Sequence, residues 1–152
     1  MTPFRLRRLT PAELALAAEM FGEGLDAGRV RLLALPVWPR AFVAGGGLIV
    51  WPARDLPEDF DDAPLCAQAT FVHELTHVWQ AQTGTNLLLA KLRAGDSPAS
   101  YAYELTPGTD FAALNLEQQA MVVEHAFLAT RGARTPCAVE LYENMGPAWG
   151  KP

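Results

Sequence analysis

The segment from His73 to His77 contains the residues whose types and spacing most clearly indicate chemistry, His-Glu-Leu-Thr-His. Histidines four residues apart on an α-helix share one face and lie roughly 6 Å apart along the axis, so both can bind one cation. Imidazole nitrogen is a preferred zinc ligand. Glu74 stands about 100° around the helix, where it can reach a water on the metal and act as general base. The pattern therefore predicts one Zn²⁺ ion and zinc-dependent hydrolysis of peptide bonds.

A catalytic zinc needs a third protein ligand and one open position. The metzincin extension of the motif fails, because Gln80 stands in place of its glycine and Thr83 in place of its third histidine. We expect Glu117, one turn inside a second long helix, to complete a His, His, Glu set. Glu124 and His125 are rivals, and Glu124 could instead hydrogen-bond a ligand histidine. Glu117 could also be a solvated carboxylate favoured by the helix dipole.

Peptide hydrolysis also needs a hydrogen-bond donor for the oxyanion that develops on the metal. Tyr101, Tyr103 and His125 are candidates, and we assign Tyr103 to this role, although each of the three also suits packing. The apolar segment Leu48 to Trp51 precedes the metal-binding helix in sequence. It predicts a strand that either borders the cleft and pairs with an extended substrate, or belongs to the core of the sheet.

The helix that carries the motif is predicted over Leu65 to Gln82, because this stretch contains no internal Gly or Pro. Asp61 or Asp62 can cap its start, and Gly84 suits its C-terminal end. Both histidines and Glu74 then belong to one rigid element.

Three further helices are expected around it. Thr10-Pro11-Ala12-Glu13 is a capping box that starts a helix near the N-terminus. Asn86 to Arg93 is a shorter helix. Asn115 caps a second long helix, Leu116 to Arg131, which Gly132 ends.

Short apolar runs predict a small sheet in the first third of the chain. Val30 to Leu35 suits a buried strand, and Ala41 to Val43 forms a hairpin with Leu48 to Trp51 around a glycine-rich turn. Gly95 to Asp110 is expected to be a loop, and the tail beyond Gly132 to be irregular. The predicted class is α+β, with a small N-terminal sheet and hairpin and a long active-site helix packed against further helices.

Length and composition agree with one globular domain over residues 1–152. The formal charge is 12 − 17 = −5, which argues against nucleic acid or an anionic membrane as partner. Cys66 and Cys137 belong to no CxxC pair and are expected to be buried free thiols. They predict neither a disulfide framework nor a thiolate metal site.

The N-terminal 20 residues carry arginines and then an apolar stretch, but Glu13 and Glu19 interrupt it and no small-residue cleavage pattern follows. No apolar run is as long as a membrane span. These features predict a cytoplasmic protein with no signal peptide or transmembrane segment, and leave non-classical export open.

Phe71 to Gln80 resembles the active helix of small bacterial zincin-like proteins, often labelled Vgr-related metallopeptidases and sometimes encoded near secretion-system genes. The resemblance extends over four further segments and runs from about Leu6 to Arg131: Leu9 to Leu14, Phe21-Gly22, Tyr101-Ala102-Tyr103 and Asn115 to Ala120. It implies a minimal gluzincin-like fold with His73, His77 and Glu117 as zinc ligands and Glu74 as base.

Two other functions compete with a zinc metallopeptidase acting on a peptide or protein substrate. A chain of 152 residues has little length left for a substrate-holding lobe, so the first is a zinc-containing binding or secretion-accessory protein without turnover. The second is a metal-free structural domain. An open groove beside the metal favours catalysis, and a filled groove favours binding.

Overall fold

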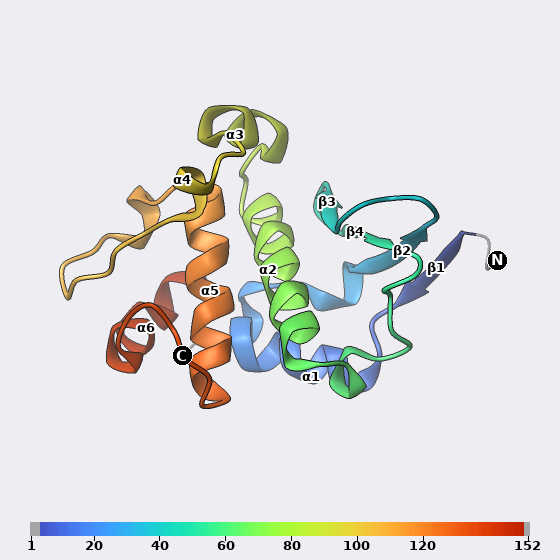
Figure 1. The fold of residues 1–152 in the computed structure, drawn as a ribbon, viewed down its shortest axis with the longest axis horizontal. Coiled ribbons are helices and arrows are strands. Elements are labelled where there is room, and N and C mark those ends of the chain that lie inside the picture. Colours follow the sequence, from blue (N-terminus) through green and yellow to red (C-terminus); the bar gives the residue numbers. More distant parts are fainter. Residues whose placement is uncertain (1–3, 151–152) are drawn as a thin grey trace.

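The computed structural model describes residues 4–150 as a four-stranded sheet with helices on one side, which confirms the α+β class (Figure 1). Residues 1–3 and 151–152, the ends of the predicted domain, lie outside the described part. The strands are β1 (Arg5–Arg8), β2 (Arg31–Leu35), β3 (Phe42–Ala44) and β4 (Leu48–Pro52).

The sheet order is β1-β2-β4-β3, with one parallel pair, β2 and β4, between two antiparallel pairs. The β3–β4 hairpin was predicted, and Val43 pairs with Ile49 at its centre. β4 has a strand on both sides, so its backbone groups are already paired. The suggestion that Leu48 to Trp51 pairs with a substrate is therefore wrong, and the edge strand on this side of the sheet is β3.

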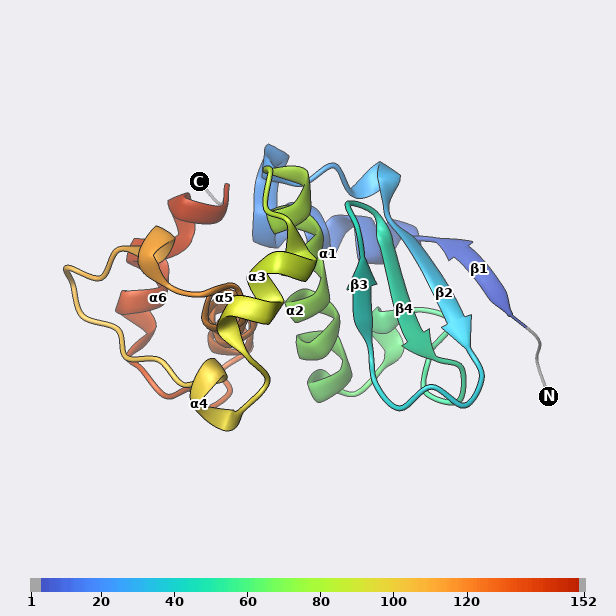
Figure 2. The ribbon, with the colours of Figure 1, turned by 90° about the horizontal axis from the view of Figure 1, so that it is seen from above.

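Helix α2 (Leu65–Gln82) has the predicted bounds and lies between the sheet and helix α5 (Leu116–Thr130) (Figure 2). The predicted capping of α2 by Asp61 or Asp62 is wrong. Both belong to a preceding 3-10 turn, η3 (Phe60–Asp62), and Pro64 precedes the helix without a side-chain cap. Because α2 is apolar on the sides that face the sheet and α5, packing compensates for the missing cap.

Helix α5 starts at the predicted capping box, in which the Asn115 side chain accepts from the backbone of Gln118 and the Gln118 side chain accepts from the backbone of Asn115. Helix α3 (Leu87–Ala94) also starts as predicted, capped by Asn86. The positions at which α3 and α5 begin are thus determined by local side-chain hydrogen bonds.

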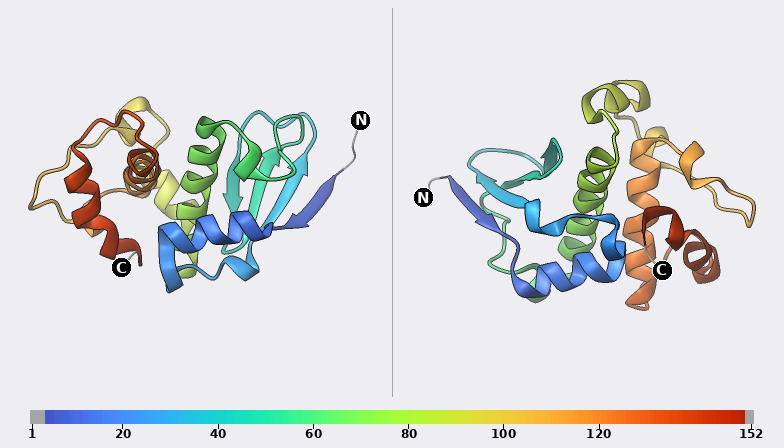
Figure 3. Two further views of the ribbon diagram at one scale, coloured as in Figure 1. Left: turned by 90° about the horizontal axis from the view of Figure 1, so that it is seen from below. Right: turned by 180° about the vertical axis from the view of Figure 1, so that it is seen from behind.

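Helix α1 (Pro11–Phe21) crosses the lower ends of α2 and the sheet (Figure 3). Its capping box is present as predicted. Glu13, although only 1% exposed, accepts hydrogen bonds from both terminal nitrogens of Arg7 and from the backbone of Phe60. This buried carboxylate is therefore fully used in joining β1, α1 and the loop before α2.

Three elements were not predicted. β1 was missed because its sequence is three arginines and one leucine, and it becomes a strand by pairing with β2 at the sheet edge. The predicted loop between Gly95 and Asp110 contains one helical turn, α4 (Pro98–Tyr101). The tail, expected to be irregular, forms α6 (Val139–Met145), which packs on α5 through Tyr142.

Five 3-10 turns complete the described chain: η1 (Gly22–Gly24), η2 (Ala27–Arg29), η3, η4 (Phe111–Ala113) and η5 (Gly146–Trp149). The core is continuous from the sheet through α2 and α5 to α6. Both cysteines are free, as expected, but Cys66 is exposed, because it lies on the solvent side of the first turn of α2. Between residues 4 and 150 no helix combines the length and apolar character that a membrane span requires.

Candidate metal centre

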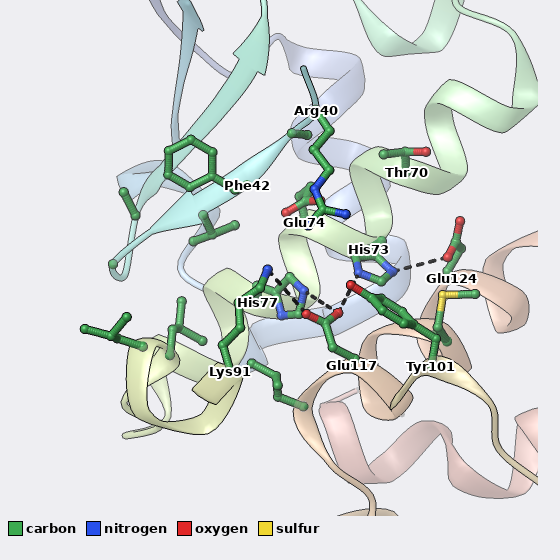
Figure 4. A pocket seen from close by; sticks show the side chains of 18 residues that line it. Arg40, Phe42, Thr70, His73, Glu74, His77, Lys91, Tyr101, Glu117 and Glu124 are labelled. Carbon is green, nitrogen blue, oxygen red and sulfur yellow. Dashed lines mark hydrogen bonds and ion pairs between the residues drawn. The ribbon is translucent and has the colours of Figure 1, made fainter. Parts of the chain in front are cut away.

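His73 and His77 extend from the face of α2 that is turned toward α5, one helical turn apart (Figure 4). Their ring centroids are 4.9 Å apart, and the ring planes are inclined by 79°. His77 is 6% exposed, and the side chain of His73 is 12% exposed. As predicted from their spacing of four residues, both rings lie close together between α2 and α5.

Glu117 extends from the first turn of α5 toward the same point. Its Oε2 atom lies 3.3 Å from Nε2 of His73 and 3.3 Å from Nε2 of His77. Ala120, one turn further along α5, is fully buried, and its small side chain allows α5 to pack closely on α2. The structure thus brings together the three predicted ligands, whose ligand atoms all lie within 4.8 Å of one another.

The three side chains fit a divalent cation. Both Glu117 oxygens are buried, and neither accepts a well-aligned hydrogen bond from the described residues. A buried carboxylate without hydrogen bonds is costly, and a cation coordinated by it would remove that cost. Two imidazole nitrogens and one carboxylate oxygen form one of the ligand sets of catalytic zinc, which leaves the fourth tetrahedral position open.

Without a metal, the acid and base at this site perturb one another. Burial lowers the pKa of His73, but the neighbouring carboxylates of Glu117 and Glu124 outweigh this effect and raise its pKa to about 10. Burial raises the pKa of Glu117, but the two imidazoles outweigh it and hold its pKa well below the usual range. Binding of a metal by His73 therefore competes with protonation of its ring.

Glu74 points into the same cavity from the next position on α2 (Figure 4). It is 7% exposed, and its Oε2 atom is buried without a hydrogen-bond partner among the described residues. Burial raises the pKa of Glu74, although the neighbouring rings of His77 and His73 oppose the shift. A carboxylate with a raised pKa beside a metal site is suited to accept and return a proton.

The Nδ1 atoms of the two histidines, which face away from Glu117, also have hydrogen-bond partners. Nδ1 of His73 lies 3.2 Å from Oε2 of Glu124, so Glu124 supports a ligand, which was the alternative considered for it. Nδ1 of His77 lies 2.8 Å from Oε1 of Gln80, a residue noted in the sequence only for breaking the metzincin pattern. Its position three residues after His77 on one helix was a usable signal.

Tyr103, the predicted catalytic donor, does not line this cavity. Its hydroxyl is hydrogen-bonded to Nδ1 of His125 and to the hydroxyl of Tyr142, 2.6 Å away, on the side of α5 that faces α6. His125 follows Glu124 by one residue, about 100° around the helix, and so faces away from the metal ligands. Neither Tyr103 nor His125 is positioned to contact a substrate at the metal.

Tyr101, the other tyrosine considered, does line the cavity. Its hydroxyl donates to Oδ1 of Asp96, 3.0 Å away, and Arg40 donates to Oδ2 of the same carboxylate, 2.9 Å away. Burial, together with the negative charge of Glu117, raises the pKa of Tyr101 to about 12. Tyr101 is therefore a neutral donor at the wall of the cavity.

The cavity beside the ligands measures about 630 Å³. One wall is the chain from Arg40 to Gly45, which includes β3, and the opposite wall is formed by α3 and α5 (Figure 4). Leu87, Leu88 and Lys91 of α3 line it, and Nζ of Lys91 lies 3.6 Å from Oε1 of Glu117. Neither Arg40 nor Lys91 was predicted from the sequence to belong to the site, because a lone basic residue forms no recognisable spacing pattern.

No model of a known protein family matches the sequence. The type VI secretion system spike protein VgrG2b of Pseudomonas aeruginosa is 34% identical over 134 residues, which cover 80% of this chain but only 13% of that much longer protein. The solved effector domain of Pseudomonas aeruginosa VgrG2b superposes with a TM-score of 0.71 at 30% identity, covering 94% of this chain and 83% of that one. This chain therefore belongs to the family of the VgrG2b effector domain.

Proposed function

We propose that this chain is a zinc-dependent peptidase that acts as an effector domain of a secretion system. The observation that carries the proposal is the convergence of His73, His77 and Glu117 on one point, with the unpartnered carboxylate of Glu74 beside them. In HExxH peptidases the glutamate that follows the first histidine is the general base. Here that glutamate lines a cavity large enough to admit part of a peptide.

A zinc ion in this ligand set supplies a Lewis acid and lowers the pKa of a water in its open position. Glu74 would accept a proton from that water and return it to the departing amine. Burial raises the pKa of Glu74, which makes the carboxylate a stronger proton acceptor than an exposed glutamate. Lys91 is the donor at the cavity wall for the charge that develops on the scissile carbonyl oxygen, and Tyr101 would join it only by giving up its hydrogen bond to Asp96.

A peptide substrate is supported by the edge strand β3. Six consecutive residues, Arg40 to Gly45, line the cavity, and β3 pairs with another strand only on its β4 side. An extended peptide could add to the free edge by main-chain hydrogen bonds, which brings a peptide bond toward the metal ligands. The charged group at this wall, Arg40, already pairs with Asp96 and leaves the strand edge open.

The place of the protein in a cell is proposed from its relatives. VgrG2b is a type VI secretion system spike protein, and the similar solved structure is the effector domain of VgrG2b. We infer that this chain likewise functions with such a system. These names support a secretion-related role more directly than they support hydrolysis, since they state no reaction.

The test is a peptide-library digestion with mass-spectrometric detection, using zinc-loaded protein and its Glu74→Gln variant. The parent is expected to cleave, and the variant to keep its zinc and lose cleavage by about 10²-fold or more, as removal of a general base requires. His73→Ala should lose both zinc and cleavage. Equal cleavage by parent and Glu74→Gln protein would remove the proposed base from the mechanism.

The second candidate is a zinc-containing effector that binds its target without turnover. The relatives favour it, because they are a secretion-system spike protein and its effector domain, and neither name refers to a reaction. The open cavity beside the ligands favours catalysis instead. Zinc-loaded protein that cleaves no member of the library, but binds a peptide at this cavity, would select the second candidate.

A further inference from the structure

Gln80 is a buried polar residue between the two helices that carry the metal ligands. It is 1% exposed, lies on α2, and makes three hydrogen bonds. Its Oε1 lies 2.8 Å from Nδ1 of His77. Its Nε2 donates to the backbone carbonyl of Leu116, 2.9 Å away, and to Oε1 of Gln119, also 2.9 Å away. All three of these side-chain hydrogen bonds are thus directed at one ligand histidine and at the first turn of α5.

We propose that Gln80 is the positioning residue of the metal centre, which holds His77 in the ring tautomer that a metal requires and keeps α5 in register with α2. The inference rests on the proposed metal site and not on peptide cleavage. It assigns a role to a residue that contacts neither the cavity nor a substrate.

The donor and acceptor of each hydrogen bond can be assigned, because the outermost partners are backbone carbonyls, which can only accept. A backbone carbonyl can only accept, so the carbonyl of Leu116 fixes which end of the Gln80 amide is the NH₂ group. Gln119 donates its own NH₂ group to the carbonyl of Phe111, 3.1 Å away, which turns its oxygen toward Gln80. This series of hydrogen bonds begins and ends at a backbone carbonyl. Neither the Gln80 amide nor the Gln119 amide can therefore be rotated by 180° without losing hydrogen bonds.

The oxygen of Gln80 must therefore face His77, where it can only accept. Nδ1 of a neutral His77 then carries the proton, and the lone pair of Nε2 points at Glu117 and the site of the metal. The opposite tautomer would place a proton on Nε2 and block coordination. Gln80 thus selects the ligand form of the imidazole before any metal arrives.

The bond to Leu116 adds a second effect. Leu116 immediately precedes Glu117, and the carbonyl that Gln80 holds belongs to the peptide unit that joins these two residues. One side chain therefore connects a histidine ligand on α2 to the backbone of the carboxylate ligand on α5. Because three ligand atoms must meet within a few tenths of an ångström for tetrahedral zinc, a shared tether of this kind favours a preformed site.

The experiment compares Gln80→Met, which keeps the length of the side chain and removes all three bonds, with Gln80→Glu, which keeps an acceptor for His77 and removes the two donors. Gln82→Met is the matched control, because Gln82 lies on the same helix and makes equivalent bonds to Asp26 and Gly46 away from the ligands. Each variant is checked for folding by circular dichroism. Its affinity for Zn²⁺ alone is measured by competition with a chelator.

Gln80→Met is expected to weaken zinc binding about 10- to 100-fold, the range for lost partners of ligand histidines, with no such loss in Gln82→Met. Gln80→Glu should lose less zinc affinity than Gln80→Met, since its carboxylate still accepts from Nδ1 of His77 but no longer donates to the carbonyl of Leu116. In ¹⁵N NMR spectra of the metal-free proteins, His77 should carry its proton on Nδ1 in the parent and in Gln80→Glu, and shift toward Nε2 in Gln80→Met.

Zinc affinity of Gln80→Met within about threefold of the parent, well under the expected range, would overturn the inference. So would an unchanged His77 tautomer in Gln80→Met, or equal losses in Gln80→Met and Gln80→Glu, which would show that the bond to His77 contributes nothing. If Gln80→Met does not fold, Gln80→Asn replaces it, because its amide is one carbon too short to keep the bond to His77. A parent that binds zinc but cleaves nothing contradicts only the peptidase proposal, and a parent that binds no zinc contradicts the metal centre while the tautomer still tests Gln80.

Discussion

Nζ of Lys91 lies 3.6 Å from Oε1 of Glu117, the carboxylate oxygen turned away from the two histidines. Lys91 comes from α3, a helix without a fully buried residue, and its side chain is 45% exposed. A single basic residue therefore stands beside a buried ligand carboxylate at the open side of the site. Its charge attracts the carboxylate in the metal-free protein and opposes a cation bound by it.

Replacing Lys91 by Met is expected to strengthen zinc binding a few-fold at low ionic strength, because a positive charge near the cation is removed. The gain should shrink as salt is added, since Lys91 is half-exposed and its field is screened. Chelator competition at two salt concentrations measures both effects. Arg93→Met is the control, as Arg93 lies on the same helix outside the cavity lining and should change nothing. Weaker zinc binding by Lys91→Met would mean that its contact with Glu117 supports the ligand more than its charge opposes the metal.

Zinc affinity is expected to rise with pH. The pKa of His73 is raised to about 10 in the metal-free protein, so below that pH the ring carries a proton that must leave when a metal binds. One released proton corresponds to about tenfold in affinity per pH unit. Chelator competition between pH 6.5 and 8.5 gives the slope, and calorimetry in buffers of different ionisation enthalpy counts the protons.

Glu124→Gln provides the matched test of this pH effect. Glu124 is one of the two carboxylates that raise the pKa of His73, so its loss should lower that pKa and flatten the pH dependence near neutrality. The same variant removes the support for Nδ1 of His73 and should weaken zinc binding at high pH by about 10-fold or more. An unchanged slope would show that the released proton comes from another group.

Substitution of Tyr103 is expected to affect mainly the stability of the protein, and substitution of Tyr101 mainly the function of the site. Tyr103→Phe leaves Nδ1 of His125 without its hydrogen-bond partner and removes one of the two hydrogen bonds of the Tyr142 hydroxyl, which should lower the free energy of unfolding by about 1–3 kcal/mol. Zinc affinity should not change. Tyr101→Phe should affect stability less, because its partner Asp96 is exposed and keeps Arg40, and should instead reduce any peptide cleavage. Thermal and denaturant unfolding give the first result, and the library digestion gives the second. The reverse pattern would restore Tyr103 to the mechanism.

Ala120→Leu tests whether the close approach of α5 to α2 determines the site. Ala120 is fully buried one turn beyond Glu117, so a larger side chain should cost about 1–3 kcal/mol of stability by overpacking. Displacement of α5 should also move Glu117 and weaken zinc binding. Ala129→Leu, a substitution at a partly buried position further along the same helix, is the control and should leave zinc affinity unchanged. Full zinc affinity in Ala120→Leu would show that the ligands tolerate a change in helix separation.

Much of the site could be predicted from local sequence alone. The run from Leu65 to Gln82 determines an uninterrupted helix, and a helix by its geometry places His73, Glu74 and His77 as they are found. The capping box at Asn115 likewise determines where α5 begins, and so places Glu117 in its first turn. These features depend on contacts between residues three or four apart, which a sequence records directly.

The remaining features were decided by contacts between distant segments. The sequence did not show that Tyr103 faces α6, that β3 and not β4 lies along the cavity, or that Lys91 reaches Glu117. Gln80 is separated from Leu116 by 36 residues, and no periodicity relates the two. Which side chains meet across a gap depends on how helices and strands pack, and packing is a property of the whole core, not of any local pattern.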